Sequence, residues 1–471
     1  PGNVATATAD VAYSVANSCR FNEPDAPSMS RGSISATNRR TWTFSYWIKR
    51  VQTTVRNSAH VGTMNHWNQG ANDGSSDTVA LFWGAGEGDY LQTWEYASDA
   101  LIYIFNTKRA FRDFSAWYHI VLACDTTQGT DTNRFKIYIN GTLLVAADFS
   151  TATYPAENVE TLVNSTNDMR IGKQYNNRYI DGYLAEFAFI DGTQYAASDF
   201  GEFDEDSPTI WKPKDLDGLT FGTNGFWLDF EDSSALGNDV SGNNNDFTPS
   251  NLAAADQASD SPTNNFCTVN FSDNYYAGAT ITEGNCKVAT GASNQTFNLG
   301  TIGLSTGKWF WEAYLTTAGG EEAIGIGALA STGTSDYGGK TAFSYSFKGN
   351  NGDIRNNDSN SDYGDAYAQD VVIGVALNLD DNEIKFYKDG TVENSGTAHS
   401  ITAAASTPTG LYFPMFGDVD SDSVVWSVNF GGSPAVAPSS GNADGDGYGN
   451  FEYAVPSGFY SICTKNLATY G

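Results

Sequence analysis

Short stretches in which hydrophobic and polar residues alternate recur along the whole chain. A repeat of two residues matches the β-strand, whose successive side chains point to opposite faces of a sheet. We find no long stretch with the 3.6-residue repeat of an amphipathic helix. The pattern therefore predicts an all-β protein built from β-sandwiches, with many short strands joined by turns. Clear examples are residues 41–48, 134–139 and 383–387.

Two of these stretches run into a dipeptide that favours a tight hairpin. Asn140-Gly141 and Asp389-Gly390 each stand between two strand-like segments. Both dipeptides tolerate the positive φ angles of a type I′ turn, which suits the twist of a β-hairpin. Each hairpin also follows an apolar stretch, at residues 117–123 and 371–377. The same local architecture thus occurs twice, about 250 residues apart, and predicts two separate sandwiches in tandem.

Composition divides the chain into four parts. We expect one β-sandwich at residues 1–200 and a second at 266–432. Between them, residues 201–265 are rich in Asp, Asn, Ser and Pro, with one apolar island at 221–230. This segment has too little apolar surface for a core of its own, so we expect an ordered polar connector wrapped on its neighbours. Residues 433–471 regain strand-like sequence after a Pro-, Ser- and Gly-rich start, which predicts a strand-containing C-terminal extension.

The chain is a polyanion. Its 471 residues include 25 Lys and Arg against 55 Asp and Glu, a net charge of −30. Such a surface is repelled by phosphate backbones and by anionic lipid, so we expect no nucleic-acid partner. No run approaches the ~20 apolar residues of a membrane-spanning helix, so we expect no membrane insertion. Neutral sugars, cations and other protein surfaces remain as partners.

The cysteines and histidines do not form disulfide or metal-binding patterns. The five cysteines are odd in number and widely spaced, without a CxxC pair, and the four histidines show no HExxH spacing. We therefore expect neither a disulfide framework nor a zinc site. The cysteines are Cys19, Cys124, Cys267, Cys286 and Cys463.

An ordered set of motifs runs through the first region. These are WYHIV at 117–121, KIYING at 136–141, MRIG at 169–172 and YIDGYLAEF at 179–187. In this order they resemble the laminin-G-like, concanavalin-A-type lectin sandwich. The resemblance implies a two-sheet domain whose loops carry the binding surface.

The second region resembles a different sandwich. Its motifs are GKWFWEA at 307–313, IGIG at 324–327, VIGVALNLD at 372–380 and IKFYKDG at 384–390. This set is similar to SPRY domains. The two resemblances together cover about three quarters of the chain and imply that both sandwiches are of the jelly-roll or concanavalin-A-like type.

The segments around the second sandwich add a third resemblance. NGFWLDF at 224–230, DVSGNNNDF at 239–247, DSPTNNF at 260–266, GYGNF at 447–451 and PSG at 456–458 are similar to segments of virion structural proteins of tailed phages, especially aquatic ones. That group is known mainly as structural, fibre-like or lectin-like proteins. The resemblance implies a place on the virion surface, outside the cell, more firmly than it implies a ligand.

Calcium is the one cofactor that the resemblance leaves open. Lectin-type sandwiches often carry calcium on the loops at one rim, where about six to eight oxygen atoms surround the ion. Two acidic clusters could supply these oxygens, and the alternative is that both are solvated turns. The candidate ligands are Asn72, Asp73, Asp77 and Asp181 in the first region and Asp444 and Asp446 near the C-terminus.

Sugar-binding surfaces pair an aromatic ring with polar side chains, because a pyranose has an apolar C–H face and a hydroxyl edge. For each aromatic residue the alternative is packing inside the core. Strand patterns predict core positions for Trp42, Trp47, Trp117, Trp309, Trp311 and Trp426. The candidate carbohydrate-binding residues are Trp67, Asn68, Trp83, Trp94, Tyr175, Asn177 and Tyr179.

Signatures of catalysis are absent from the sequence. Glycoside hydrolysis needs two carboxyl groups about 5–10 Å apart, and the ExDxxE pattern of laminarinase-type enzymes does not occur. Glu186 and Glu312 are single strand carboxylates in different domains. No Walker loop is present either. We therefore expect that the protein is not an enzyme.

We predict a non-enzymatic virion surface protein of a tailed phage, as a fibre, an appendage or a capsid decoration. Its expected role is weak, multivalent adhesion to host-surface glycans, and its expected partners are other virion proteins and further copies of itself. Two alternatives remain open. One is a secreted or surface-anchored bacterial glycan-binding adhesin, and the other is a virion cement protein that binds no glycan.

Overall fold

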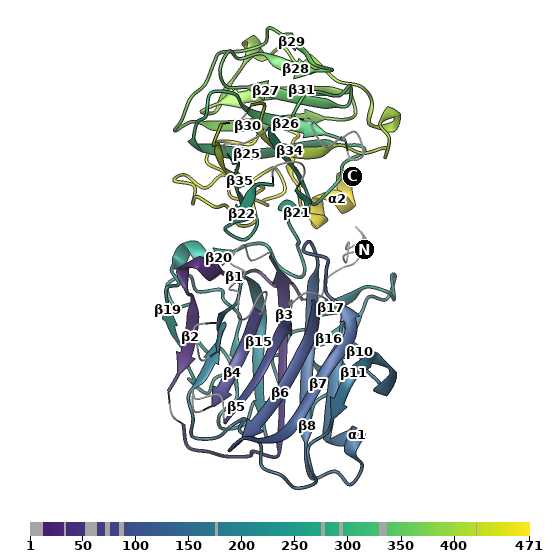
Figure 1. Ribbon diagram of the computed structural model, residues 1–471, viewed down its shortest axis with the longest axis vertical. Helices are drawn as coiled ribbons and strands as arrows, with labels where there is room; N and C mark the ends of the chain where they lie inside the picture. The colour runs from purple at the N-terminus through teal and green to yellow at the C-terminus, as the bar shows by residue number, and fades with distance from the viewer. Residues whose placement is uncertain are drawn as a thin grey trace. The chain divides into compact units, whose positions relative to one another are not determined.

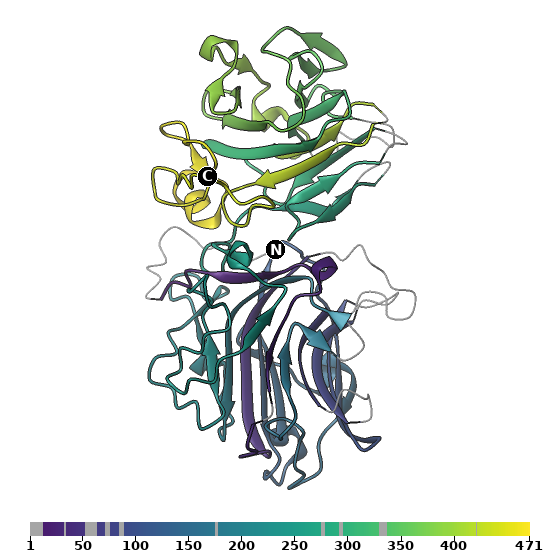
Figure 2. The ribbon, with the colours of Figure 1, turned by 90° about the vertical axis from the view of Figure 1, so that its left-hand side faces the viewer.

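The computed structural model describes residues 13–32, 34–51, 64–70, 76–83, 89–174, 178–274, 278–291, 295–328, 337–420 and 422–471. The chain divides into two compact units, one ending at Thr263 and the other beginning at Asn264. In each unit the strands form two large, mainly antiparallel sheets (Figures 1 and 2). The predicted all-β class with two sandwiches in tandem is confirmed.

The first unit is built from two sheets. Sheet A runs in the order β10 (Thr142–Leu143), β9 (Phe135–Ile139), β8 (Trp117–Asp125), β3 (Thr41–Arg50), β15 (Gly182–Asp191), β1 (Ser18–Phe21) and β20 (Gln257–Ala258), and β18 (Phe226–Leu228) also pairs with β15. Sheet B runs in the order β11 (Phe149–Thr153), β7 (Ala100–Ala110), β6 (Tyr90–Ala97), β5 (Asp77–Trp83), β4 (Met64–Gly70), β12 (Met169–Ile171), β2 (Ser28–Arg31) and β19 (Thr248–Ser250). Two small ribbons join β13 (Lys173–Gln174) to β14 (Arg178–Tyr179) and β16 (Gly201–Phe203) to β17 (Trp211–Pro213).

The second unit repeats the two-sheet plan. Sheet C runs in the order β21 (Val269–Asn274), β24 (Thr296–Gly300), β34 (Phe413–Asp418), β26 (Glu322–Gly327), β27 (Ser344–Lys348), β28 (Ile354–Asn356) and β29 (Ser359–Ser361). Sheet D runs in the order β22 (Thr280–Thr282), β23 (Lys287–Ala289), β35 (Val425–Asn429), β25 (Lys308–Thr317), β30 (Val372–Asn378), β31 (Glu383–Lys388) and β32 (Thr391–Val392). In addition, β33 (His399–Ser400) pairs with β31 and β36 (Tyr460–Ser461) pairs with β25.

Helices are short in the described parts of the chain. The α-helices are α1 (Asp131–Arg134) and α2 (Thr464–Tyr470). Single 3₁₀ turns occur at Glu23–Asp25, Ala146–Asp148, Ala197–Asp199, Ala254–Asp256, Asn394–Gly396 and Ala404–Ser406. None of these described helices is long and apolar enough to span a membrane.

Both predicted hairpins form with the expected turn. Asn140 and Gly141 have φ angles of 46° and 76°, and they connect β9 to β10. Asp389 and Gly390 have φ angles of 48° and 75°, and they connect β31 to β32. Positive φ at both central positions is the requirement of a type I′ turn. The dipeptides therefore predicted these turns correctly.

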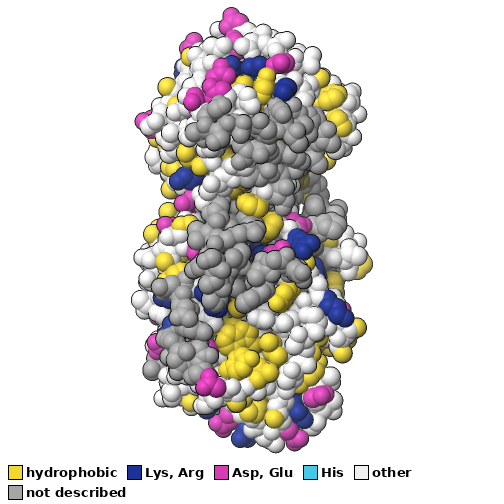
Figure 3. Space-filling model, viewed as in Figure 1, with side chains coloured by type: hydrophobic (Ala, Val, Ile, Leu, Met, Phe, Trp, Pro, Cys, Tyr) yellow, Lys and Arg dark blue, Asp and Glu magenta, His cyan; other side chains and the backbone are white. Residues whose placement is uncertain are grey.

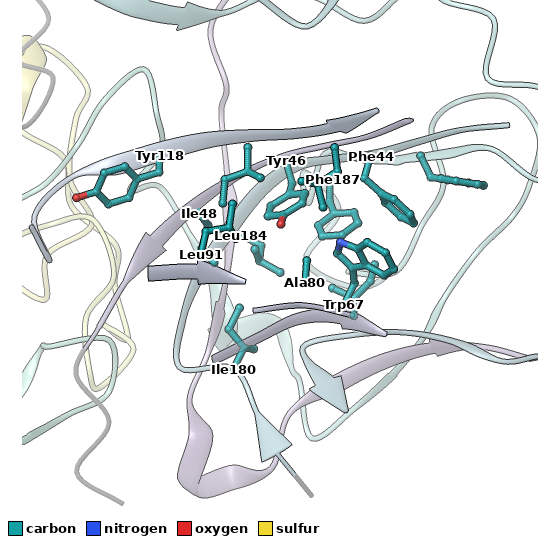
Figure 4. Packing of buried hydrophobic residues seen from close by; sticks show 14 of the residues in the cluster. Phe44, Tyr46, Ile48, Trp67, Ala80, Leu91, Tyr118, Ile180, Leu184 and Phe187 are labelled. Atoms are coloured by element: carbon teal, nitrogen blue, oxygen red, sulfur yellow. The ribbon is translucent and has the colours of Figure 1, made fainter. Parts of the chain in front are cut away.

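The main core of the first unit lies between sheets A and B. Phe44 of β3 stacks on Trp67 of β4, with ring centroids 4.1 Å apart. Tyr46 stacks on Phe187 of β15 at 4.9 Å, and these rings meet Ala80 and Leu91 of sheet B in the same layer (Figure 4). Stacked aromatic pairs of this kind add to the stabilisation from burying their area. The six tryptophans predicted as core, Trp42, Trp47, Trp117, Trp309, Trp311 and Trp426, are all buried.

Sheet A is buried on its other face as well. All ten residues of β15 are buried, as are the last nine of β3. Trp47 and Trp117 point away from the main core into a second apolar layer with Trp211 and Trp227. Trp211 and Trp227 belong to the segment expected to be a connector. Residues 201–263 are therefore part of the first unit. Residues 201–221 and 258–263 cover the outer face of sheet A, whereas β18, β19 and β20 extend the two sheets and Phe226, Leu228 and Phe247 lie in the main core.

A buried ion pair holds the end of this covering segment to the sheet. Lys49 of β3 and Asp260 lie 2.6 Å apart, and neither side chain is more than 1% exposed. The indole of Trp117 donates a second hydrogen bond to Asp260, at 3.0 Å. A buried carboxylate is tolerated when it is paired and hydrogen-bonded in this way.

The C-terminal extension packs on the second unit. As predicted, it contributes a strand, since β36 lies parallel to β25. Phe451 and Phe310 of β25 approach edge to face at 5.3 Å, on the face of sheet D that points away from the core. The extension also contains α2, which the sequence pattern did not predict. A seven-residue helix shows too few turns for its periodicity to be recognised.

Two acidic side chains are buried next to each other in sheet C. Glu322 of β26 and Asp418 of β34 are direct cross-strand neighbours, and both are buried. Glu322 accepts hydrogen bonds from the backbone N–H groups of Gly319 and Gly320. The donors near Asp418 are the Thr290 side chain and the Thr296 backbone N–H, and both act against the effect of burial on its pKa. Burial raises the pKa of Asp418 to about 7, because the charged form loses its hydration.

We expect the Lys49–Asp260 pair to be essential for folding. Replacing Asp260 by Ala should lower the free energy of unfolding by about 3–5 kcal/mol, because it removes the carboxylate that neutralises the buried Lys49 ammonium. Urea denaturation measures this change. Glu160→Ala is the matched control, since Glu160 pairs with Arg39 at the surface, where such pairs contribute less than about 1 kcal/mol. Equal losses for the two variants would contradict the prediction.

Removing the charge of Asp418 should stabilise the protein, whereas removing that of Asp260 should destabilise it. A carboxyl with a raised pKa in the folded state makes the fold less stable as the pH rises from about 4 towards 7, because the unfolded chain releases its proton first. Asp418→Asn should therefore stabilise the protein by about 2 kcal/mol at pH 8 and show no gain below pH 4. Thermal unfolding across this pH range, with the exposed Asp362→Asn as control, measures it. A pH-independent effect would rule out the charge as the cause.

Candidate functional site

An aromatic surface lies on the outward side of sheet B. Strand β6 alternates, so Leu91 points into the core and Trp94 and Tyr96 point away from it. The rings of Trp94 and Tyr96 meet edge to face at 5.5 Å, and both are half-buried. Across the ladder to β7, Trp94 pairs with Ile104 and Tyr96 with Leu101, which is 41% exposed. We call Trp94, Tyr96, Leu101 and Ile104 the aromatic face, and Figure 3 shows hydrophobic side chains gathered there over β6.

Polar side chains continue this surface along the same strands. Gln92 of β6 pairs with Asn106 of β7 and donates a 2.8 Å hydrogen bond to its side-chain oxygen. Thr151 and Thr153 of β11 lie opposite Asn106 and Ile104. The surface therefore offers flat apolar rings next to amides and hydroxyls. This is the combination that a pyranose ring can contact with its C–H face and its hydroxyl edge.

The structure separates the predicted carbohydrate-binding residues into three groups. Trp67 and Asn68 are fully buried, so the prediction that they bind sugar is wrong. Trp67 occupies an inward position of β4, where it stacks on Phe44. Trp94 is at the surface, and Tyr179 is half-buried with the Lys173 ammonium 5.2 Å from its ring centroid. Tyr175, Asn177 and the side chain of Trp83 lie outside the described residues.

The predicted calcium ligands of the first region remain only partly placed. Asp77 begins β5, is fully buried and accepts a 3.4 Å hydrogen bond from Asn68. Asp181 is 5% exposed and faces the backbone N–H of Glu23 at 3.5 Å. Asn72 and Asp73 lie outside the described residues. Within the described parts, no three His, Cys, Asp or Glu side chains gather closely enough to hold a metal ion.

Near the C-terminus, the side chain of Asp444 organises the extension. Its carboxylate accepts hydrogen bonds from the backbone of Asp446, Tyr448 and Ser461, and from the side chains of Ser461 and Asn466. Asp446 accepts one from the Tyr470 hydroxyl at 2.9 Å. A calcium ion at Asp444 would have to displace these N–H and O–H donors. The alternating acidic pattern is explained by the turn it stabilises.

A pocket of about 330 Å³ lies on the outward face of sheet D. Strands β25, β30 and β35 contribute its sheet residues, and Asp370 lies just before β30. The β31–β32 turn and the C-terminal segment, residues 436–439 and 452–453, complete the lining. The turn fits closely, because a Cβ atom on Gly390 would lie 2.6 Å from the Tyr453 ring. The lining residues are Glu312, Tyr314, Asp370, Val372, Asp389, Ser427, Asn429, Val436, Ala437, Pro438, Ser439, Glu452 and Tyr453.

Glu312 attaches the C-terminal segment to the sheet and so completes the pocket. It alternates with core residues along β25 and therefore points outward, yet it is only 2% exposed. Its two oxygens accept the backbone N–H groups of Glu452 at 2.8 Å and Tyr453 at 2.9 Å. Burial raises its pKa to about 7, and the two backbone hydrogen bonds act in the opposite direction.

The pocket was not predicted, although part of its signal is in the sequence. Glu312 stands between two core residues of a strand, so alternation places it outside the core. Asp389 was recognised only as a turn residue. The position of Tyr453 and Glu452 opposite them depends on contacts about 140 residues apart. Alternation and turn chemistry report local structure and cannot supply such contacts.

Glu186 and Glu312, the two strand carboxylates noted in the sequence, both have structural partners. Glu186 is 4% exposed and lies at a bulge in β15. It accepts hydrogen bonds from the Trp227 indole at 2.9 Å and the Tyr13 hydroxyl at 3.1 Å. Burial raises its pKa to about 8. Glu312 thus fixes the C-terminal segment onto sheet D, whereas Glu186 links β15 to the neighbouring strand β18 of the same sheet and to Tyr13.

Comparison with known families agrees with this architecture. Residues 27–197 match the family described as the concanavalin A-like lectin/glucanases superfamily. Residues 308–431 match the SPRY domain. No curated protein matches the chain. The chain therefore contains a concanavalin A-like domain followed by a SPRY domain, as the motifs predicted.

Solved structures similar to the chain include SPRY domains. The SPRY domain of human HERC1 is 12% identical, with 34% of this chain and 96% of that one covered and a TM-score of 0.28. Another human SPRY domain is 18% identical, with 30% and 90% covered and a TM-score of 0.24. Stonustoxin is 18% identical, with 34% of this chain and 26% of stonustoxin covered and a TM-score of 0.26.

These two domain types fit a role in binding or adhesion, and both are typically non-enzymatic. In each unit the outward face of one sheet carries a surface suited to a ligand. In the first unit this is the aromatic face, and in the second it is the acidic pocket.

We expect Glu312→Ala to loosen the C-terminal segment. The backbone amides of Glu452 and Tyr453 lose their acceptors, so their hydrogen exchange should accelerate about tenfold or more. Hydrogen–deuterium exchange of peptides covering residues 450–455 measures this change. Tyr314→Phe is the control, because it removes only the hydrogen bond to Asp370. Unchanged exchange in the Glu312 variant would show that the segment is held by its apolar contacts alone.

Proposed function

We propose that this protein is a non-enzymatic surface protein of a tailed-phage virion that binds host-surface glycans weakly and in many copies. The aromatic face carries this proposal. Trp94 and Tyr96 present half-exposed rings on a concanavalin A-like domain, next to the Gln92–Asn106 amide pair. A sugar ring placed on Trp94 has hydrogen-bond donors and acceptors for its hydroxyl groups within the same surface.

The composition of the chain supports a neutral glycan as the ligand. With a net charge of −30, the protein repels anionic partners at long range. A single flat platform without a deep cavity gives weak affinity per site. Many copies arrayed on one particle convert such affinity into stable attachment. We therefore propose that the protein acts as a homo-oligomer, arranged with other virion proteins as a fibre, an appendage or a capsid decoration.

The virion assignment rests on sequence resemblance. The segments at 224–230 and 239–247 contribute to the main core of the first unit, and the segment at 260–266 includes the boundary between Thr263 and Asn264. All three resemble segments of tailed-phage structural proteins. Immunogold labelling of intact particles with antibody against this protein tests the assignment directly. Labelling of a bacterial surface in uninfected cells would support the adhesin alternative instead.

We expect Trp94→Ala to weaken glycan binding by about tenfold per site, because the sugar loses its stacking surface. A glycan array read with the protein displayed on beads measures this loss. Phe203→Ala is the matched control, since Phe203 is an exposed aromatic residue of the same unit, 45% exposed, on β16. The same array read with EDTA tests the calcium prediction. If the displayed protein binds no glycan but still binds virus particles from which this protein has been removed, the cement alternative is correct.

A further inference from the structure

The pocket on sheet D differs from the aromatic face in its charge. Its lining contains four carboxyl groups, those of Glu312, Asp370, Asp389 and Glu452, and all lining residues are described. No Lys, Arg or His side chain is among them. Hydrogen bonds from Ser439 hold the pKa of Glu452 below its ordinary value, which keeps that carboxyl ionised at neutral pH. A ligand with positive charge therefore matches this pocket electrostatically.

Hydrogen bonding restricts the class of ligand further, because most hydrogen-bond donors of the lining already bind acceptors within the protein. Ser439 donates both its N–H and its hydroxyl to Glu452 at 2.6 Å. The Tyr314 hydroxyl donates to Asp370 at 2.8 Å, and the Asn429 amide donates to the carbonyl of Asn450 at 2.8 Å. The carboxylates keep further lone pairs as acceptors. The pocket thus suits a group that only donates hydrogen bonds.

The remaining lining is apolar and aromatic. Tyr314, Tyr453, Pro438, Val372 and Val436 surround the acidic groups, and Val436 is 47% exposed at the surface. A cation attached to an aliphatic chain gains contact with such residues, and a tyrosine ring attracts the cation itself. A pyranose, by contrast, carries hydroxyl oxygens that also need donors, and these the lining largely lacks.

We propose that this acidic pocket binds the ammonium or guanidinium end of a lysine or arginine side chain presented by a partner protein. An ammonium or guanidinium group donates hydrogen bonds and accepts none. Its alkyl stem lies along the tyrosines and Pro438, and its charge faces Asp370 and Asp389. The proposal is independent of glycan binding at the aromatic face, which lies in the other unit.

Two isosteric substitutions remove charge from the pocket without disturbing its geometry. Asp370 and Asp389 have φ angles of 69° and 48°, a conformation that asparagine also tolerates. In Asp370→Asn the side-chain oxygen can still accept from Tyr314, and in Asp389→Asn it can still accept from the backbone of Val372. The Asp389→Asn change also keeps a preferred residue in the type I′ turn. We therefore expect the double variant to fold normally.

The test uses the full chain and a fluorescein-labelled peptide in which lysines alternate with glycines. Fluorescence anisotropy at physiological ionic strength should show binding of this peptide and at least tenfold weaker binding when its lysines are Nε-acetylated. The double variant D370N/D389N should bind the lysine peptide about fivefold more weakly. Asp362→Asn, an exposed acidic residue of the same unit outside the pocket, should leave the affinity unchanged.

Other results overturn the proposal. Equal losses in D370N/D389N and Asp362→Asn would mean that the lysine peptide responds only to the overall negative charge. Tighter binding of a glucosamine oligomer than of the lysine peptide would assign the pocket to an amino sugar.

Val372→Lys gives an independent check, because it places an ammonium group of the protein itself in the pocket and should block the peptide. Trp94→Ala should leave peptide binding intact, which separates this test from that of glycan binding.

Discussion

In both units a sheet carries apolar side chains on both of its faces, and its outer face must therefore be covered. In the first unit, β3 and β15 bury both faces, and residues 201–221 and 258–263 cover the second face. In the second unit, Phe310 of sheet D is covered by Phe451 of the C-terminal extension. A strand with two apolar faces is stable only between two layers. Each unit therefore includes a covering segment in addition to its two sheets.

The covering segments also explain where buried acidic groups occur. Asp260 pairs with Lys49, Glu186 accepts the Trp227 indole, and Glu312 accepts two backbone N–H groups of the C-terminal segment. Asp260 and Glu312 each join a covering segment to a sheet, and Glu186 joins β15 to its neighbouring strand β18. Polar contacts of this kind have strict geometry, whereas apolar contacts tolerate sliding. They fix the register of segments that are mostly irregular.

Much of this fold could be predicted from the sequence, because its signals are local. The alternation of β9, the turns at Asn140-Gly141 and Asp389-Gly390, and the six core tryptophans all follow from short-range patterns. Trp67 shows where that reasoning fails. Its neighbours are polar and rich in Asn, as in a binding loop, but a bulge in β4 between Asn65 and Trp67 lets His66 and Trp67 both point into the core. Simple alternation does not predict two successive inward residues.

The candidate sites were harder to predict than the fold for the same reason. Trp94 was a candidate because it lies among aromatic residues beside a glycine-rich stretch, but its neighbours Ile104 and Leu101 come from the pairing of β6 with β7. The acidic pocket joins residues from β25, β30, β35 and the C-terminal segment. Such sites arise from the crossing of distant segments. A single sequence contains the side chains of these sites but not their juxtaposition.

The order of segments along the first unit has a consequence for biosynthesis. Residues 27–197, which carry the concanavalin A-like signature, leave the ribosome before the segment that covers Trp47 and Trp117. Until residues 201–263 follow, the nascent sandwich displays a broad apolar surface to its surroundings. A fragment cut at the conventional domain boundary would keep that surface permanently and would tend to aggregate. For recombinant work, the natural end of the first module is therefore Thr263.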